Sequence, residues 1–138
     1  FGDISGNHIN PAVTLAFAAD KRFGWKEVPT YLIAQFTGAF AASGLLHFLF
    51  PANEMLGTTQ PSGSVMQSFI METIMTFILI LVILRVSTGA KEKGITAGIV
   101  IGSTVAFLVL FGGPISGTSI NPTRSIAPAI VSGHLENL

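Results

Sequence analysis

The stretch SGNHINPAVTLAFAAD, residues 5–20, decides the fold, because it has strong helix-start signals yet leaves room for only a short helix. Asn10 is a favoured N-cap residue, and Pro11 is favoured at the first helical position. The apolar run that follows, residues 11–19, is nine residues long and ends at the charged Asp20. At 1.5 Å per residue this helix reaches about 14 Å, roughly half of a membrane's hydrocarbon core.

A second copy of this stretch, SGTSINPTRSIAPAI, occupies residues 116–130. The copies align without gaps. Identical residues stand at five aligned pairs of positions: Ser5 and Ser116, Gly6 and Gly117, Ile9 and Ile120, Asn10 and Asn121, and Pro11 and Pro122. The second copy predicts another short helix, over about residues 122–131.

The composition is that of a membrane protein. The chain has 138 residues, of which 49% are hydrophobic and 10% charged, whereas a soluble domain carries about 25% charged residues. Three runs are long and apolar enough to cross a bilayer: about residues 28–50, 65–86 and 94–113. The net charge is zero, which argues against nucleic acid as a partner.

Catalytic and metal chemistry find no support in this sequence. Cysteine is absent, and His8, His47 and His134 lie in separate segments. No spacing of metal ligands or of a serine–histidine pair is present. We therefore expect a protein that is not an enzyme and that has no catalytic residue, no metal and no cofactor.

The basic residues predict how the chain crosses the membrane. They gather before the first span and between the second and third spans, at Lys21, Arg22, Lys26, Arg85, Lys91 and Lys93. The connection over residues 51–63 has none, so the positive-inside rule places this connection outside and the basic clusters in the cytoplasm. Trp25 and Tyr31 are interpreted as anchors at the headgroup level.

The number of spans between the two copies fixes their relationship. Three spans separate them, so they enter the membrane from opposite sides and form an inverted repeat. Each short helix is then half of a re-entrant segment, preceded by a non-helical stretch, residues 5–9 or 116–120. Carbonyl groups, two asparagine amides and two positive helix ends would line a path for neutral polar molecules and repel cations.

The two boxes resemble the paired Asn-Pro-Ala boxes of the major intrinsic protein family, the aquaporins and glycerol facilitators. YLIAQFTGA, METIMTF and GPISGTSINPTRSIAPA agree with that family as well. The resemblance implies an all-α membrane fold, an aquaporin-like inverted repeat with two re-entrant half-helices. Family members have six spans, so residues 1–138 are expected to be one channel domain, incomplete at both ends, with three of the six. It further implies a homotetramer in the plasma (inner) membrane, with water and small neutral solutes passing through.

The resemblance also implies the roles of individual residues. The boxes are Asn10, Pro11 and Ala12, and Asn121, Pro122 and Thr123, with Asn10 and Asn121 donating hydrogen bonds to the permeant. The selectivity filter would include Val109, Thr118 and Arg124. Pore carbonyls would come from Gly6, Asn7, His8, Gly117, Thr118 and Ser119, and Glu72 would support the second loop.

Two departures from the commonest family pattern bear on the solute. Thr123 stands where alanine is usual, and Val109 stands where water-selective members have histidine. Val109 makes the chain similar to nodulin-26-like plant channels and their bacterial relatives, which are associated with water, glycerol, urea or metalloid hydroxides. Ser125 and Ala129, however, match the water-channel pattern.

Three other functions stay open from these residues. A strictly water-selective channel is the first alternative. Broken helices in an inverted repeat also fit a secondary active transporter, although Glu72 is the chief ionisable group in the spans. A structural membrane protein with a plugged pore is the third.

Overall fold

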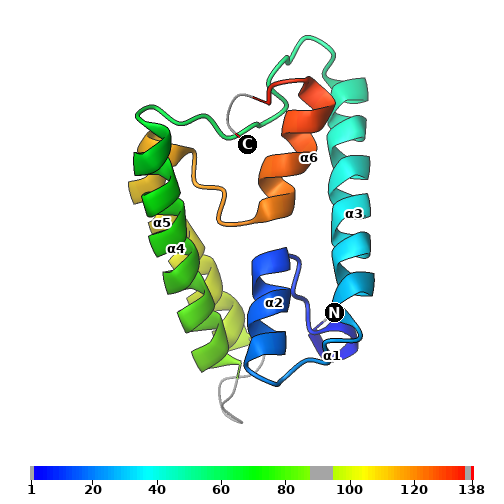
Figure 1. Ribbon diagram of the computed structural model, residues 1–138, viewed down its shortest axis with the longest axis vertical. Helices are drawn as coiled ribbons and strands as arrows, with labels where there is room; N and C mark the ends of the chain where they lie inside the picture. Colours follow the sequence, from blue (N-terminus) through cyan, green and yellow to red (C-terminus); the bar gives the residue numbers. More distant parts are fainter. Residues whose placement is uncertain (1, 88–94, 136–137) are drawn as a thin grey trace. The chain divides into compact units, whose positions relative to one another are not determined.

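The computed structural model describes residues 2–87, 95–135 and 138. Within this part the chain forms helices, turns and irregular connections, and no strand. The helices are α1 (Gly2–Ser5), α2 (Pro11–Ala19), α3 (Val28–Leu49), α4 (Val65–Val86), α5 (Ile95–Ser116) and α6 (Pro122–Ser132) (Figure 1). Gly94, where the third span was expected to begin, and the basic residues Lys91 and Lys93 lie outside the described residues.

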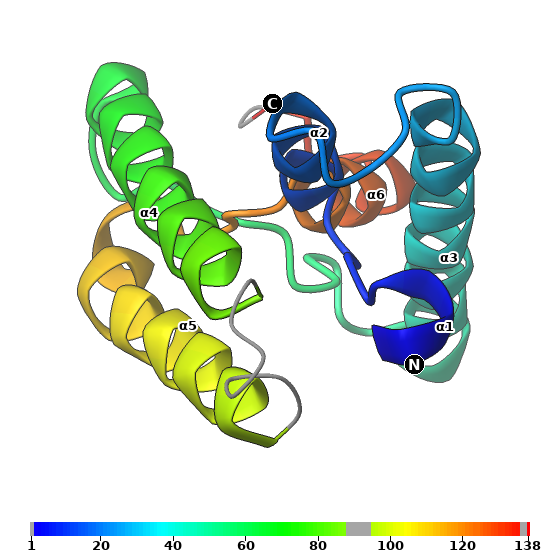
Figure 2. The same ribbon diagram turned by 90° about the horizontal axis from the view of Figure 1, so that it is seen from below.

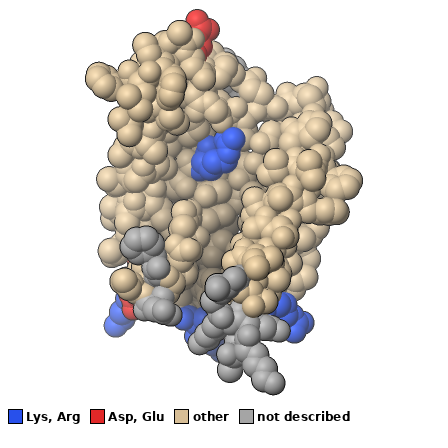
Figure 3. Space-filling model, turned by 180° about the vertical axis from the view of Figure 1, so that it is seen from behind, with Lys and Arg blue, Asp and Glu red and all other residues tan. Residues whose placement is uncertain are grey.

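The helices α3, α4 and α5 have the length and composition of membrane spans. Each contains 22 residues, which at 1.5 Å per residue is about 33 Å, enough for a hydrocarbon core. Many of their large apolar side chains face outward: Phe48 is 80% exposed, Val65 79% and Leu110 74%. Charged side chains cover little of the face drawn in Figure 3. Such surfaces suit lipid rather than water.

The short helices α2 and α6 begin at the predicted caps. The Asn10 side-chain oxygen accepts from the Ala12 amide at 2.9 Å, and the Asn121 oxygen accepts from the Thr123 amide at 3.1 Å. In both helices proline follows the cap. These contacts confirm the two N-caps, and they satisfy amides that a helix start leaves without an intrahelical partner.

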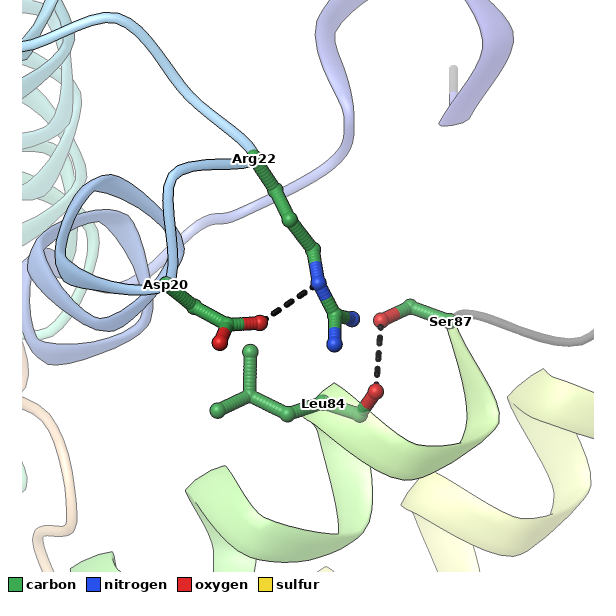
Figure 4. A network of polar contacts seen from close by, with 4 residues as sticks. All are labelled: Asp20, Arg22, Leu84 and Ser87. Carbon is green, nitrogen blue, oxygen red and sulfur yellow. Dashed lines mark hydrogen bonds and ion pairs between the residues drawn. The ribbon is translucent and has the colours of Figure 1, made fainter.

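The other end of α2 is held by an ion pair. Asp20 is the C-cap, where the negative end of the helix dipole disfavours a carboxylate. Arg22 Nε lies 2.5 Å from Asp20 Oδ2 and supplies the compensating charge (Figure 4). The same view shows the end of α4, where the Ser87 hydroxyl donates to the Leu84 carbonyl at 3.4 Å.

The chain divides into two compact units. Unit 1 contains Phe1–Thr58 and Asn121–Leu138, and unit 2 contains Thr59–Ile120. In unit 1, α2 and α6 pack against α3, and Figures 1 and 2 show them end to end beside it. In unit 2, α4 packs against α5 around an apolar core made of Met75, Leu79, Leu108 and Ile120.

The helix α5 is longer than the sequence predicted. It was expected to end at Gly113 but runs through Pro114 to Ser116. The connection before α4 explains the extension, because Ser62 satisfies the carbonyls of this last turn. Its hydroxyl donates to the Pro114 carbonyl at 2.7 Å, and its amide donates to the Ile115 carbonyl at 3.0 Å.

The expected non-helical stretches are therefore each one residue shorter. Ser5 ends α1, a short helix that the sequence did not predict, just as Ser116 ends α5. The Gly6 amide donates to the Gly2 carbonyl at 2.9 Å, and the Gly117 amide to the Gly113 carbonyl at 3.0 Å. In both copies of the motif, the glycine after the serine thus closes the preceding helix with the same backbone hydrogen bond.

Candidate functional site: a cavity at the meeting point of two half-helices

A cavity of about 870 Å³ lies in unit 1, where the two half-helices meet. The first non-helical loop, the inner side of α3, a turn at residues 56–57 and the start of α6 line it. Five of the predicted site residues are among the lining residues: Asn7, His8, Asn121, Thr123 and Arg124. The lining is mostly apolar, with a few polar groups, as in many small-molecule sites.

The N-terminal ends of α2 and α6 are joined by a hydrogen bond from the second box to the residue that precedes the first box. The Asn121 side-chain nitrogen donates to the Ile9 carbonyl at 3.1 Å. The Asn121 oxygen is held by two donors of Thr123, the amide at 3.1 Å and the hydroxyl at 2.7 Å. Thr123, which is 4% exposed, therefore fixes the orientation of the Asn121 amide.

The remaining box residues surround the caps. Asn10 is 7% exposed and is not among the residues that line the cavity. Pro11 is buried, Ala12 is half-buried and Pro122 is exposed.

The two non-helical loops share an unusual backbone. Gly6, Asn7 and Ile9 have left-handed φ angles of 65°, 51° and 50°. The corresponding residues of the second loop have φ angles of 78° at Gly117, 43° at Thr118 and 46° at Ile120. Each non-glycine residue in this region costs about 1–3 kcal/mol and persists only where the surrounding structure holds it. Both loops are therefore held by specific contacts.

An aromatic cluster holds the first loop. The His8 ring stacks on Phe17, with centroids 4.9 Å apart and planes within 1°, and also contacts Phe23 and Tyr31. The Tyr31 hydroxyl donates to the Ser5 carbonyl at 3.1 Å. Tyr31, interpreted from the sequence as a headgroup anchor, therefore also helps to hold this loop.

A buried hydroxyl connects this loop to α3. Thr14 is fully buried, and its hydroxyl donates to the Asn10 carbonyl at 3.2 Å. Gln35 Nε2 donates to that hydroxyl at 2.9 Å, and His8 Nδ1 lies 3.1 Å from it. Sequence reasoning missed this network, although a lone glutamine in an apolar span was a signal for it.

A carboxylate holds the second loop, within unit 2. Glu72 Oε1 accepts from the Ser119 amide at 2.9 Å and from the Ser116 hydroxyl at 2.6 Å. Glu72 Oε2 accepts from the Ile120 amide at 2.7 Å. Hydrogen bonds to a carboxylate are shorter and stronger than neutral ones, so one side chain fixes three donors of the loop.

Unit 2 also contains Val109 and Thr118. Val109 is on α5 and is 45% exposed. The Thr118 side chain is 5% exposed, and its hydroxyl lies 3.9 Å from the Met75 sulfur. Gly112 makes room for both side chains, since a β-carbon there would overlap the Met75 sulfur.

Arg124, in the first turn of α6, is the cation among the cavity-lining residues of unit 1. Its Nη1 donates to the Gly57 carbonyl at 2.9 Å. Within the described residues, no group of three or more His, Cys, Asp or Glu side chains could hold a metal ion.

Comparison with known proteins decides the family. The chain matches the family model described as "Major intrinsic protein" over residues 1–138. The chain belongs to the major intrinsic protein family. Members of this family are channels, not enzymes.

The relatives include plant proteins named nodulin-26 and aquaporin NIP1-1. The chain is 48% identical over 138 residues to nodulin-26 of Glycine max, covering 99% of this chain and 51% of that protein. It is 47% identical to aquaporin NIP1-1 of Zea mays over 138 residues, covering 99% and 49% respectively. The chain therefore spans about half the length of the curated relatives it matches.

A solved structure confirms the fold class. The X-ray structure of the aquaglyceroporin from Plasmodium falciparum superposes with a TM-score of 0.83 at 27% identity. The match covers 95% of this chain and 59% of that one. The all-helical membrane fold of the family, with its inverted repeat and re-entrant half-helices, is thus the fold of this chain.

Proposed function

We propose that the protein is a passive membrane channel for water and small uncharged solutes such as glycerol, urea or metalloid hydroxides. The observation that carries this proposal is the meeting of α2 and α6, where the Asn121 amide binds the Ile9 carbonyl beside a cavity. The oxygen atoms of Asn10 and Asn121 are used by the caps, so their amide nitrogens are the groups that donate away from the helices.

Electrostatics would exclude cations and protons from this path. Each half-helix carries roughly half a positive charge at its N-terminus, and the two ends meet in unit 1. The Arg124 guanidinium adds a full positive charge to the cavity lining. A neutral molecule is not repelled by these charges and finds both donors and acceptors.

The predicted roles of the unit 2 residues complete the proposal. Val109 would widen the filter and make it apolar, and Gly117, Thr118 and Ser119 would contribute main-chain carbonyls beside those of Gly6, Asn7 and His8. Glu72 would keep the second loop in shape, which its three hydrogen bonds support. We further propose a homotetramer in the plasma (inner) membrane, with the basic connections on the cytoplasmic side.

The proposal is tested by stopped-flow light scattering on proteoliposomes that contain the protein at its natural full length. We expect both water and glycerol to pass in the wild type. Val109→His should reduce glycerol permeability about tenfold or more while water still passes, because the ring narrows the filter and adds a donor. Val109→Leu is the matched control, since it changes volume without adding a hydrogen-bond donor.

Other outcomes would change the conclusion. A wild type that passes water and excludes glycerol would be a strictly water-selective channel, as Ser125 and Ala129 suggest by their resemblance. Uptake that stops when an uncoupler collapses the ion gradients would indicate a transporter. A wild type that passes neither molecule would refute the channel.

A further inference from the structure

The connection between α3 and α4 lines the cavity but belongs neither to a box nor to a helix. Leu56 and Gly57 of this connection line the cavity together with Arg124. Leu56 is 5% exposed, whereas residues 51–54 before it and Gly57 after it are exposed. The Gly57 carbonyl accepts from Arg124 Nη1 at 2.9 Å, so this turn contacts the filter arginine directly.

The backbone of this turn is strained. Leu56 and Gly57 have consecutive left-handed φ angles of 48° and 78°. Glycine adopts such angles readily, but leucine rarely does. A strained leucine beside a functional group is a reason to look for a role, because strain of this kind persists only where other contacts hold it.

Contacts on both sides hold the turn. The Asn53 side-chain oxygen accepts from the amides of Met55 at 3.2 Å and Leu56 at 3.1 Å. On the other side, the amide and hydroxyl of Thr58 donate to the Met55 carbonyl at 2.8 Å and 2.5 Å. The Thr58 hydroxyl also lies 3.3 Å from the Ser132 hydroxyl at the end of α6. The turn is therefore tied to the helix that carries Arg124.

Leu56 is one of the buried apolar residues of unit 1. The core cluster of buried apolar residues is in unit 2 and does not include it. In unit 1, Leu56 borders the cavity with Leu46, Pro128 and Arg124. The Arg124 guanidinium and the Leu56 side chain border the same cavity, which suits a small polyol or amide. The guanidinium can bind the oxygen atoms of such a solute, and the leucine can contact its carbon atoms.

We propose that Leu56 is a further specificity-determining residue of the channel, which sets the size of solute that passes Arg124, and that Asn53 is its positioning residue. This inference rests on the proposed function. The turn at residues 53–58 holds a leucine in a left-handed conformation so that it narrows the cavity, and the same turn presents the Gly57 carbonyl to the arginine.

The test compares water, glycerol and urea permeabilities of the natural full-length protein in proteoliposomes. Leu56→Ala should raise the glycerol-to-water ratio about tenfold, because it removes three carbons from the cavity wall. Leu56→Phe should lower the same ratio. Glu54→Gln, an exposed change in the same turn, is the matched control and should leave the ratio unchanged.

The positioning role is tested separately. Asn53→Leu removes the acceptor for the two amides and should shift the ratio in the same direction as Leu56→Ala. Asn53→Asp keeps an acceptor and should restore the wild-type ratio. Unchanged ratios in both Leu56 variants, with wild-type amounts of protein in the vesicles, would overturn the inference and leave the channel intact. A wild type that passes none of the three molecules would refute the proposed function instead.

Discussion

Glu72 offers a sharp test of how the second loop is held. Its carboxylate accepts from the Ser119 and Ile120 amides and from the Ser116 hydroxyl, at 2.9, 2.7 and 2.6 Å. A glutamine can keep its oxygen toward the two donors on one side, but its amino group must then face the Ile120 amide. Glu72→Gln thus loses one hydrogen bond, makes the other two bonds neutral and leaves a donor unsatisfied, which costs about 2–3 kcal/mol.

Hydrogen exchange measures this cost locally. Since about 1.4 kcal/mol is a tenfold change in an equilibrium, the Ile120 amide should exchange on the order of 30–140 times faster in Glu72→Gln. Glu72→Ala leaves three donors without the carboxylate. The free energy of unfolding should fall by about 3–5 kcal/mol, and the protein in detergent should unfold at a lower temperature.

The control for these variants is on the same helix. Thr73 is exposed, and its hydroxyl donates to the Phe69 carbonyl of α4 at 2.7 Å. Thr73→Val should therefore leave the exchange of the loop amides unchanged. If the Ser119 and Ile120 amides stay as protected in Glu72→Gln as in the wild type, the carboxylate does not hold the loop and the reasoning is wrong.

Three further substitutions probe contacts of the loops and boxes. Thr123→Ala removes the 2.7 Å bond to Asn121 and should lower the free energy of unfolding by about 1 kcal/mol, whereas Thr123→Ser should restore it in thermal melts. Gly117→Ala should cost about 2–4 kcal/mol and reduce the yield of folded protein, since its φ is 78° and backbone passes 3.0 Å from the added carbon. Tyr31→Phe removes the donor to the Ser5 carbonyl, and faster exchange of the first-loop amides should follow, whereas a purely anchoring tyrosine would show no such effect.

The two half-helices and the three spans were predictable because their signals are local. Asn10 and Asn121 each precede a proline, and a nine-residue apolar run cannot span a membrane, so caps and half-helices follow from adjacent residues. The long apolar runs likewise mark spans by length alone. The resemblance to the family supports these half-helices and spans, but they could be predicted without it.

The shape of the loops could not be predicted in this way. Ile9 and Ile120 are β-branched and disfavour left-handed angles, so local preference points away from the observed backbone. Contacts from distant residues hold them there: Ile9 binds Asn121 from 112 residues away, and Ile120 binds Glu72 from 48. The helical turn that ends at Ser116 has the same kind of cause, since it depends on Ser62 rather than on its own sequence.

Unit 1 is discontinuous in the chain, so a ribosome makes its two parts at different times. Asn121 follows Ile9 by 112 residues, which at about 5–20 residues per second is a delay on the order of ten seconds. Throughout that interval the first half-helix exists without the amide that will bind the loop before it. A nascent chain that stalls before residue 121 would leave the Ile9 carbonyl without its Asn121 donor, while the contacts from Thr14, Tyr31 and Gln35 could already have formed.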